Sequence, residues 1–348
     1  MDITTIGLDL AKSVSHVVCC NQAGKIVRKK MLRRTQILHF FSELAPCLVG
    51  VESCASAHYW AREIAKYGHQ VKQIAPQHVK AYVRGNKTDF NDALAIAEAV
   101  VRPEMRFVRT KTQTQQDIQA LHVMRKKCER DRTANSNEIR GLLNEYGIIL
   151  PVGISHVYKS LPELFDRQVE NGLSELFKEL LERHYQKLVE LDEHLNWYTK
   201  KIKQLSQHEA CRRLQSIPGV GPIIASALYQ HIGNGSEFKN GRAVSSSLGL
   251  VPKQHSSGGK HNLQGISKRG DSYLRTLLIH GARAVMRVSK HKETPLSQWI
   301  KRIEQTRGRN KAAVALANKL ARIAWALLAQ GGDCLLYTSD AADDNAGV

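Results

Sequence analysis

The sequence has few aromatic residues and no long apolar stretch. Phe, Trp and Tyr together make up 6% of the 348 residues, and no uninterrupted apolar run reaches 18 residues. A membrane-spanning helix needs about 20 mostly apolar residues, so the composition predicts no transmembrane segment. The chain begins with Met1-Asp2-Ile3, which opens a strand and not a signal peptide. We therefore expect a cytoplasmic protein.

Paired cysteine and histidine motifs are also missing. The seven cysteines show no C-x-x-C spacing, and none of the 15 histidines forms an H-x-x-x-H or H-E-x-x-H pair. Disulfide frameworks and structural zinc sites depend on such pairs. We expect reduced, mostly buried thiols and no structural metal.

Acidic residues are scarce compared with basic ones. The chain has 51 Lys and Arg against 32 Asp and Glu, a formal net charge of +19. From residue 239 to residue 311 there are 16 basic residues and three acids, a net of +13. Such an excess favours a polyanionic partner, and nucleic acid is the usual one. An acidic membrane surface is the alternative, but the sequence has no long basic amphipathic helix with bulky apolar residues.

Strand-like and helix-like segments alternate over residues 1–105. Their order is β-β-β-α-β-α-β-α. The expected strands are 3–10, 15–21, 26–32, 47–52 and 71–74, and the expected helices are 35–44, 57–67 and one that starts near 89. Three antiparallel strands followed by parallel crossovers are typical of an α/β ribonuclease H-like domain.

Residues 106–210 are predicted to form two long helices. The first, from Arg106 to Asn144, contains no Pro and has a net charge of +5, from nine basic and four acidic residues. Its 3-4 seam is half polar, so it cannot be an independent coiled-coil strand. The second, from about Pro162 to Gln207, has an apolar heptad seam. We expect an antiparallel helical pair, whose basic residues fit either a solvated face or a nucleic-acid contact.

The C-terminal part is predicted to be mainly helical. Residues 217–225 resemble a helix-hairpin-helix turn, in which Gly219 and Gly221 let the backbone approach a phosphate. A plain turn between two helices is the alternative. Residues 312–330 are rich in Ala and Leu, which is typical of a core helix.

The end of the chain departs from this pattern. Residues 333–348 resemble translated sequencing-adaptor read-through more than evolved protein. We expect this non-native tail to be disordered or loosely placed and to have no part in the function.

Four acids occupy positions that suit a metal site. Asp9 ends the first expected strand, Glu52 ends the fourth, and Asp89 and Asp92 lie three residues apart on one helix face. The helical acids alone also fit an ordinary helix start, where the dipole favours negative charge. The first and fourth strands of a ribonuclease H-like sheet are neighbours, so the four carboxylates could hold two Mg²⁺ ions about 3.5–4 Å apart for phosphoryl transfer. The lysines placed to neutralise substrate phosphate nearby are Lys12 and Lys87.

A second candidate site lies in the basic segment. Ser256 and Ser257 precede Gly258 and Gly259, whose backbone can adopt tight turns and approach a phosphate closely. The basic residues that could hold flanking phosphates are Lys253, Lys260, Lys268, Arg269 and Arg275. The alternative is a flexible phosphate-binding loop in which the serines only donate hydrogen bonds.

In combination, these motifs resemble those of the DEDD transposases of bacterial insertion sequences, the family of bridge-RNA-guided recombinases that includes the Piv-type DNA invertases. The resemblance covers about residues 3–330. The segments that carry it are Gly7 to Lys12, Glu52, Lys87 to Ala93, Ile217 to Gly221, Gly249 to Pro252 and Ser257-Gly258.

The resemblance implies three domains. They are a RuvC-like DEDD nuclease domain (1–105), a helical coiled-coil region (106–210) and a mainly α-helical transposase domain with a helix-hairpin-helix-like motif (211–332). The four acids match the metal ligands of the family. Ser257 matches a nucleophile that attacks a DNA phosphodiester and forms a phosphoserine link, with Ser256 as the alternative.

The resemblance also implies partners. DNA would be the substrate, and a structured guide RNA would choose target and donor sequences by base pairing. The metal-bearing domain of one protomer and the serine of another would form a composite site, which requires a dimer or tetramer.

Two other functions fit the residues. A RuvC-like, Mg²⁺-dependent DNA junction nuclease would use metal-activated water and need no serine. A non-catalytic basic RNA-binding scaffold would need neither the acids nor the serine. An assay for protein covalently bound to cleaved DNA separates the recombinase from the nuclease, and acid variants that keep full cellular function would support the scaffold.

Overall fold

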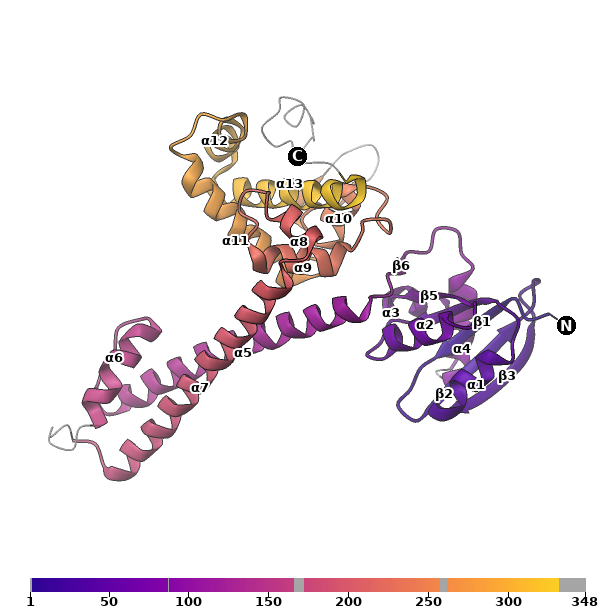
Figure 1. Cartoon of the computed structure of the whole chain (residues 1–348), viewed down its shortest axis with the longest axis horizontal. Coiled ribbons are helices and arrows are strands. Elements are labelled where there is room, and N and C mark those ends of the chain that lie inside the picture. The colour runs from indigo at the N-terminus through magenta and orange to yellow at the C-terminus, as the bar shows by residue number, and fades with distance from the viewer. Residues whose placement is uncertain (1, 87, 166–171, 257–261, 332–348) are drawn as a thin grey trace. The chain divides into compact units, whose positions relative to one another are not determined.

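The computed structural model describes residues 2–86, 88–165, 172–256 and 262–331 (Figure 1). The chain divides into two compact units, residues 1–113 and residues 114–348. Several residues named from the sequence lie outside the described ones: Lys87, Ser257, Gly258, Gly259, Lys260 and the tail 333–348.

The first unit is built on a six-stranded mixed sheet in the order β3-β2-β1-β4-β5-β6. Its strands are β1 (Thr5–Asp9), β2 (Val14–Cys20), β3 (Ile26–Arg33), β4 (Leu48–Glu52), β5 (Gln70–Ile74) and β6 (Phe107–Val108). The pairs β1–β2 and β2–β3 are antiparallel, whereas β1–β4 and β4–β5 are parallel. The predicted order of elements is therefore confirmed, and β1 lies beside β4 as expected.

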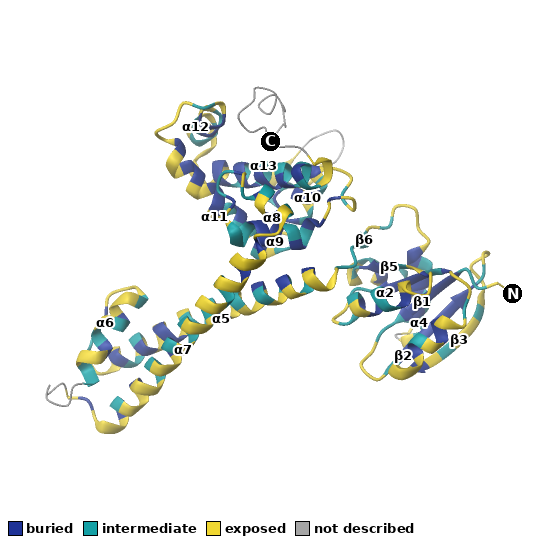
Figure 2. Ribbon diagram, in the orientation of Figure 1, coloured by how far each residue is buried: buried dark blue, intermediate teal, exposed yellow. Residues whose placement is uncertain are grey.

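Helices cover both faces of this sheet. On one face, α1 (Ile37–Ser42) and α2 (Ala57–Ala65) bury Phe40, Phe41 and Trp60 against the sheet. On the other face lies α4 (Asp89–Val100), whose alanines pack on β1 and β2. The short helices are η1 (Arg34–Gln36), α3 (Pro76–Val79) and η2 (Lys80–Tyr82). Figure 2 shows that burial is greatest in the central strands and that β3 is largely exposed.

Two glycines let α4 lie directly on the sheet. A Cβ on Gly7 of β1 would come within 1.9 Å of the carbonyl oxygen of Ala93, and one on Gly50 of β4 within 2.9 Å of Ile96 Cγ2. Any side chain at these two positions would push the helix away. The start of α4 is thereby held close to the ends of β1 and β4.

The second unit begins with helices whose bounds differ from the prediction. The first long helix, α5 (Gln113–Glu145), starts seven residues later than Arg106, because Phe107 and Val108 pair with β5 as the edge strand β6. The predicted second helix is split into α6 (Ile154–Phe165) and α7 (Glu175–Leu205). Pro162 lies inside α6 and does not begin a helix. The start of α7 is set by Ser174, whose side chain accepts a hydrogen bond from the backbone N–H of Phe177.

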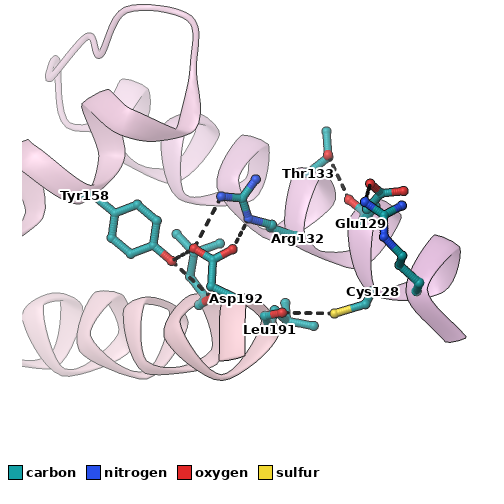
Figure 3. Close-up of polar contacts among 9 residues, drawn as sticks. Cys128, Glu129, Arg132, Thr133, Tyr158, Leu191 and Asp192 are labelled. Atoms are coloured by element: carbon teal, nitrogen blue, oxygen red, sulfur yellow. Dashed lines mark hydrogen bonds and ion pairs between the residues drawn. The ribbon is translucent and has the colours of Figure 1, made fainter. Parts of the chain in front are cut away.

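Polar side chains join α5 to α7 along the seam (Figure 3). Arg132 of α5 forms an ion pair with Asp192 of α7, and Tyr158 of α6 donates a 2.5 Å hydrogen bond to the same carboxylate. Cys128 donates to the carbonyl of Leu191 (3.0 Å). Further along α5, Asn135 donates to the carbonyl of His184 (2.8 Å), so the two helices run antiparallel. The assignment of this pair as a coiled coil stays a prediction.

The rest of the second unit is a helical bundle with one small β-hairpin. Its helices are α8 (Glu209–Leu214), α9 (Pro222–Ile232), α10 (Gly241–Ser247), α11 (Ser272–Ser289), α12 (Pro295–Arg307) and α13 (Arg309–Gln330). The hairpin consists of β7 (Pro252–Gln254) and β8 (Leu263–Ile266). By length and composition α13 could cross a membrane. However, its buried residues, such as Leu316 and Leu320, belong to the core of this bundle, as predicted from its Ala and Leu content.

The cysteines match their prediction in the part of the chain that the structure describes. Cys19, Cys20, Cys47, Cys128 and Cys211 are buried free thiols, and Cys54 is an exposed one. Burial raises the pKa of the Cys19, Cys47 and Cys211 thiols to about 11, so these three residues stay protonated at neutral pH.

Candidate metal centre and basic hairpin

The alternation of side chains along β1 and β4 directs two acids to the same face of the sheet. Gly7 faces α4, so Asp9, two residues later, faces the same way; Gly50 and Glu52 repeat the relation on β4. Because β1 and β4 are parallel neighbours in which Leu8 pairs with Val51, Asp9 and Glu52 end their strands side by side.

The start of α4 brings the other two acids close to the ends of β1 and β4. Thr88 caps the helix by accepting a hydrogen bond from the N–H of Asn91 (3.2 Å), and α4 therefore begins at Asp89. Asp89 and Asp92 both lie in the first turn, where the helix dipole favours negative charge. The helix dipole therefore stabilises Asp89 and Asp92 where they stand, and the same position also brings them close to Asp9 and Glu52.

His16 is a member of this cluster that the sequence analysis missed. It lies directly opposite Asp9 on β2 and is buried, and its ring contacts Phe90 of α4 edge to face. Among the described residues, Asp9, His16 and Asp89 offer ligand atoms that all lie within 4.8 Å of one another. The register of the β1–β2 hairpin is the feature that would have predicted the role of His16, since Asp9 and His16 are cross-strand partners.

Mutual repulsion of the acids is visible in the ionisation of Asp9. The pKa of Asp9 is raised from 3.8 to about 6, first by burial and then by the charges of Asp92, Asp89 and Glu52 in that order. All three carboxylates thus lie near enough to act on Asp9. Glu52 and Asp92 nevertheless fall outside the 4.8 Å group formed by the other ligands.

The donor set fits a hard divalent cation. Carboxylate oxygens are the ligands that Mg²⁺ prefers, and a cation among them would relieve the repulsion that raises the pKa of Asp9. The Nδ1 atom of His16 is buried without a hydrogen bond and lies 3.5 Å from Asp89 Oδ2, so a polar atom of this cluster still lacks a partner. Asp9, Asp89, Asp92 and Glu52 would hold the metal.

Lys12 lies close to these acids in the sequence. It is exposed in the loop that joins β1 to β2, three residues after Asp9.

Ser256 follows strand β7 of the β7–β8 hairpin by two residues. The N–H of His255 donates to the carbonyl of Asn262 (3.0 Å), which closes the hairpin around the residues between them. Ser256 is exposed and accepts a hydrogen bond from Gln254 Nε2 (2.9 Å). Ser256 therefore lies next to a two-stranded support, and Ser257 lies outside the described residues.

The predicted phosphate-binding cations near the hairpin divide into two kinds. Lys253, Lys268 and Arg269 are exposed. Arg275 is half-buried, and its guanidinium donates to the carbonyl oxygen of Leu248 (2.9 Å), so it supports the base of the hairpin. Close backbone contact explains Gly249, whose φ is +66° and whose Cβ would lie 2.2 Å from the carbonyl oxygen of Arg269.

The two glycines of the 217–225 turn also differ. Gly219 has a φ of +79°, and a Cβ there would lie 2.6 Å from the carbonyl oxygen of Gly281, so this glycine allows the turn to pack on α11. Gly221 precedes α9, and a Cβ there would meet nothing within 4 Å. Gly221 is thus the glycine of the pair with room for an incoming group, and the helix-hairpin-helix assignment stays a prediction.

Comparisons with known proteins match the parts of the chain that contain the acids and the hairpin. Residues 6–148 match a model of DEDD transposases of the IS110 type, and residues 211–296 match the model described as the transposase IS116/IS110/IS902 family. A probable family 20 transposase of Pseudomonas aeruginosa is 45% identical over 95% of this chain and 98% of its own length. The transposase for insertion sequence element IS1111A of Coxiella burnetii is 44% identical over 94% and 90%. A pilin gene-inverting protein of Moraxella bovis is 25% identical over 95% and 97%.

Proposed function

This chain belongs to the IS116/IS110/IS902 family of transposases, and we propose that it cuts and rejoins DNA through a phosphoserine intermediate, aided by a magnesium-binding carboxylate centre. The observation that carries the proposal is that Asp9, Glu52 and the first turn of α4 meet at the carboxyl ends of β1 and β4. Asp9 responds electrostatically to the other three acids.

The acids and the serine have separate tasks in this proposal. Asp9, Glu52, Asp89 and Asp92 hold Mg²⁺, two ions by the number of carboxylates. Bound metal would supply the positive charge that activates an attacking group and stabilises a leaving oxygen. Ser257 supplies the nucleophile; it follows the exposed Ser256 in the sequence, and Arg275 holds the base of the β7–β8 hairpin.

The covalent chemistry conserves the number of phosphodiester bonds. The Oγ of Ser257 loses its proton and attacks a DNA phosphorus; an Oγ–P bond forms, and the bond from phosphorus to one sugar oxygen breaks and leaves a hydroxyl. A hydroxyl of the second DNA strand then attacks the phosphoserine and releases the serine. No external energy source is needed, because one ester replaces another at each step.

The remaining parts of the proposal concern partners and organisation. The nuclease domain is assigned to 1–105, the coiled-coil region to 106–210 and the transposase domain to 211–332. A structured guide RNA chooses the DNA sequences, and a dimer or tetramer acts on the DNA in the cytoplasm. The basic segment 239–311, with its net charge of +13, provides the surface for phosphate backbones, including Lys253, Lys268 and Arg269.

A search for covalent protein–DNA adducts tests the nucleophile. With labelled DNA and Mg²⁺, the unmodified chain and Ser256→Ala should give an adduct that survives denaturing electrophoresis, whereas Ser257→Ala should give none. Asp89→Ala should lose the adduct as well, because its metal site is incomplete. An adduct of normal yield from Ser257→Ala would overturn the assignment, and cleavage without any adduct would favour the junction nuclease.

Guidance by RNA is tested separately. Removal of copurifying RNA with ribonuclease should abolish the choice of DNA sequence, and adding back a transcript from the non-coding end of the element should restore it. Unchanged sequence choice after ribonuclease treatment would contradict the role of RNA.

A further inference from the structure

Strand β3, the residue before it and the residue after it carry an uninterrupted excess of basic residues that the proposed function does not use. Residues 25–34 contain six Lys or Arg and no acid. They are Lys25, Arg28, Lys29, Lys30, Arg33 and Arg34. We call this segment the β3 basic strip. β3 is an edge strand, since its neighbour in the sheet is β2 on one side alone.

The charges of the β3 basic strip are not neutralised within the described residues, where none of the six forms an ion pair with a carboxylate. Instead, four of them lie over aromatic rings. Lys29 lies over Phe90 (5.7 Å from Nζ to the ring centre), and Arg34 lies over Trp60 (5.0 Å from Cζ). Arg28 and Lys30 share the ring of Phe40. Cation–π contacts hold the side chains without removing their charge.

The register of the sheet connects one face of the strip to the carboxylate centre. Asp9 pairs with His16 across β1 and β2, and His16 pairs with Met31 across β2 and β3, so the three residues form one cross-strand row. Lys29 and Arg33 flank Met31 at two residues on either side and therefore point to the same face. Lys29 also reaches Phe90, the residue after Asp89.

The opposite face of β3 carries two further charges away from the acids. Arg28 and Lys30 alternate with Lys29 and lie on the side of α1, where Leu32 enters the core with Phe40. The two faces of one strand thus offer a matched pair of sites, with two cations toward the carboxylate centre and two away from it.

Protection of a sheet edge does not by itself account for this arrangement. Charged side chains on an edge strand, lysines above all, prevent pairing with other chains, but that role does not require the charges to adjoin a cluster of acids. A strip without a single acid, continuous with a cluster of carboxylates, has the charge that a phosphate backbone requires. Met31 between the two cations is 57% exposed, which leaves the face open.

We propose that the α4-side face of β3, formed by Lys29, Met31 and Arg33, holds the DNA strand whose reacting phosphate lies at the carboxylate centre. Lys29 and Arg33 are four residues apart, about 13 Å along the strand, so they meet different phosphates. The N–H of Arg34 donates to the carbonyl of Ser13 in the loop after Asp9 (3.1 Å), which joins the strip to the site. The inference rests on the proposed function for the identity of the strand.

Salt-dependent DNA binding by the full chain tests the proposal with a matched control. The Lys29→Gln/Arg33→Gln double variant and the Arg28→Gln/Lys30→Gln double variant lose the same charge from opposite faces. Binding of a short labelled DNA duplex is measured in EDTA, without cleavage, over a series of salt concentrations. The first variant should reduce the slope of log affinity against log salt by about 1.8, since each phosphate contact contributes about 0.9. The control should leave the slope unchanged.

Photo-crosslinking locates the contact and does not depend on the stability of the double variants. A photoreactive amino acid in place of Met31 should crosslink to the DNA, whereas one in place of the exposed His39 of α1 should not. Three results would overturn the proposal. They are equal slopes for the two double variants, crosslinking at both positions, and crosslinking at Met31 to RNA and not to DNA. Loss of the covalent adduct in Ser257→Ala bears on the proposed function alone, because binding in EDTA is measured without chemistry.

Discussion

Asp9 is placed under two opposing demands. Burial and three neighbouring carboxylates raise its pKa to about 6, whereas a carboxylate that binds a metal must be ionised. Without metal, the folded chain therefore binds a proton at Asp9 more tightly than the unfolded chain does. The stability that this proton provides is complete below pH 3.8 and is lost as the pH rises through about 6.

Asp9→Asn should therefore stabilise the metal-free protein at neutral pH. We expect a gain of about 1–2 kcal/mol at pH 7.5 in EDTA, after allowance for the partial exposure of the group, and little change near pH 4. Added Mg²⁺ should raise the melting temperature of the unmodified chain and have a smaller effect on the variant. Thermal unfolding with and without Mg²⁺ measures both, with Asp117→Asn, an exposed acid on α5, as control. An equal Mg²⁺ response in the two proteins would contradict Asp9 as a ligand.

Among the elements, α4 carries two of the four acids and owes its position to two glycines of the sheet. Nothing larger than hydrogen fits between Gly7 and the backbone of Ala93. The contact fixes the helix start against the strand ends with little freedom, so the geometry of the carboxylates depends on residues that have no chemistry of their own.

Gly7→Ala should lower the free energy of unfolding by about 1–3 kcal/mol, since the added methyl group overpacks the contact. It should also abolish stabilisation by Mg²⁺, because α4 must move away from Asp9. Gly141→Ala is the matched control: its Cβ would meet nothing within 4 Å in α5, and it should raise stability by about 0.5–1 kcal/mol. A normal Mg²⁺ response in Gly7→Ala would show that the close approach of α4 is not required.

The polar seam between α5 and α7 gives a prediction for the helical region. Asp192→Ala leaves the half-buried guanidinium of Arg132 and the hydroxyl of Tyr158 without their shared partner. We expect a loss of about 1–3 kcal/mol. Hydrogen exchange of the α5 and α7 amides should report it as local opening.

The control for the seam is an exposed ion pair. Glu293 is 76% exposed and bonds Lys301, so Glu293→Ala should cost less than about 0.5 kcal/mol. Equal protection of the amides in the Asp192 variant and the unmodified chain would mean that apolar contacts alone hold the two helices together.

At the scale of the whole molecule, the two candidate sites belong to different compact units. The acids lie within residues 1–113, and the serine hairpin lies within residues 114–348. A reaction that needs both can take them from one protomer or from two.

A mixture of Asp89→Ala and Ser257→Ala proteins distinguishes these arrangements. If the site is shared between protomers, a mixed dimer combines the intact acids of one chain with the intact serine of the other, and the mixture should regain part of the adduct that each variant alone lacks. Adduct formation is measured after the two proteins are mixed and allowed to exchange subunits. No recovery in a mixture shown to contain mixed dimers would place both parts of the site in one chain.

Much of the first unit could be predicted because its signals are local. Short apolar strands that end in Asp9 and Glu52, and a helix that opens with Asp89, are all read from neighbouring residues. The role of His16 depends on the register of a hairpin, and the departure of Phe107 and Val108 from the expected helix depends on the free edge of β5. Such pairings are settled by contacts between distant segments, which composition and periodicity do not report.

The same limit applies to the second unit. Arg275 has the charge of a phosphate ligand, but its position directs it to backbone carbonyls beneath the hairpin. The seam of α5 predicted poor self-association, and the partners that satisfy its polar residues lie more than 45 residues away in the sequence, as for Asn135 and His184.

The contact of α4 with Gly7 and Gly50 has a consequence for the decay of mobile elements. Every missense change at a glycine adds at least a Cβ, so each of these two codons is a place where one mutation can silence the carboxylate centre. The basic hairpin and the helices around it belong to the other compact unit and would be left intact. If the basic hairpin binds DNA as proposed, a silenced copy would keep that surface without the chemistry, and it would compete with active copies for the same DNA and lower the rate at which the element spreads.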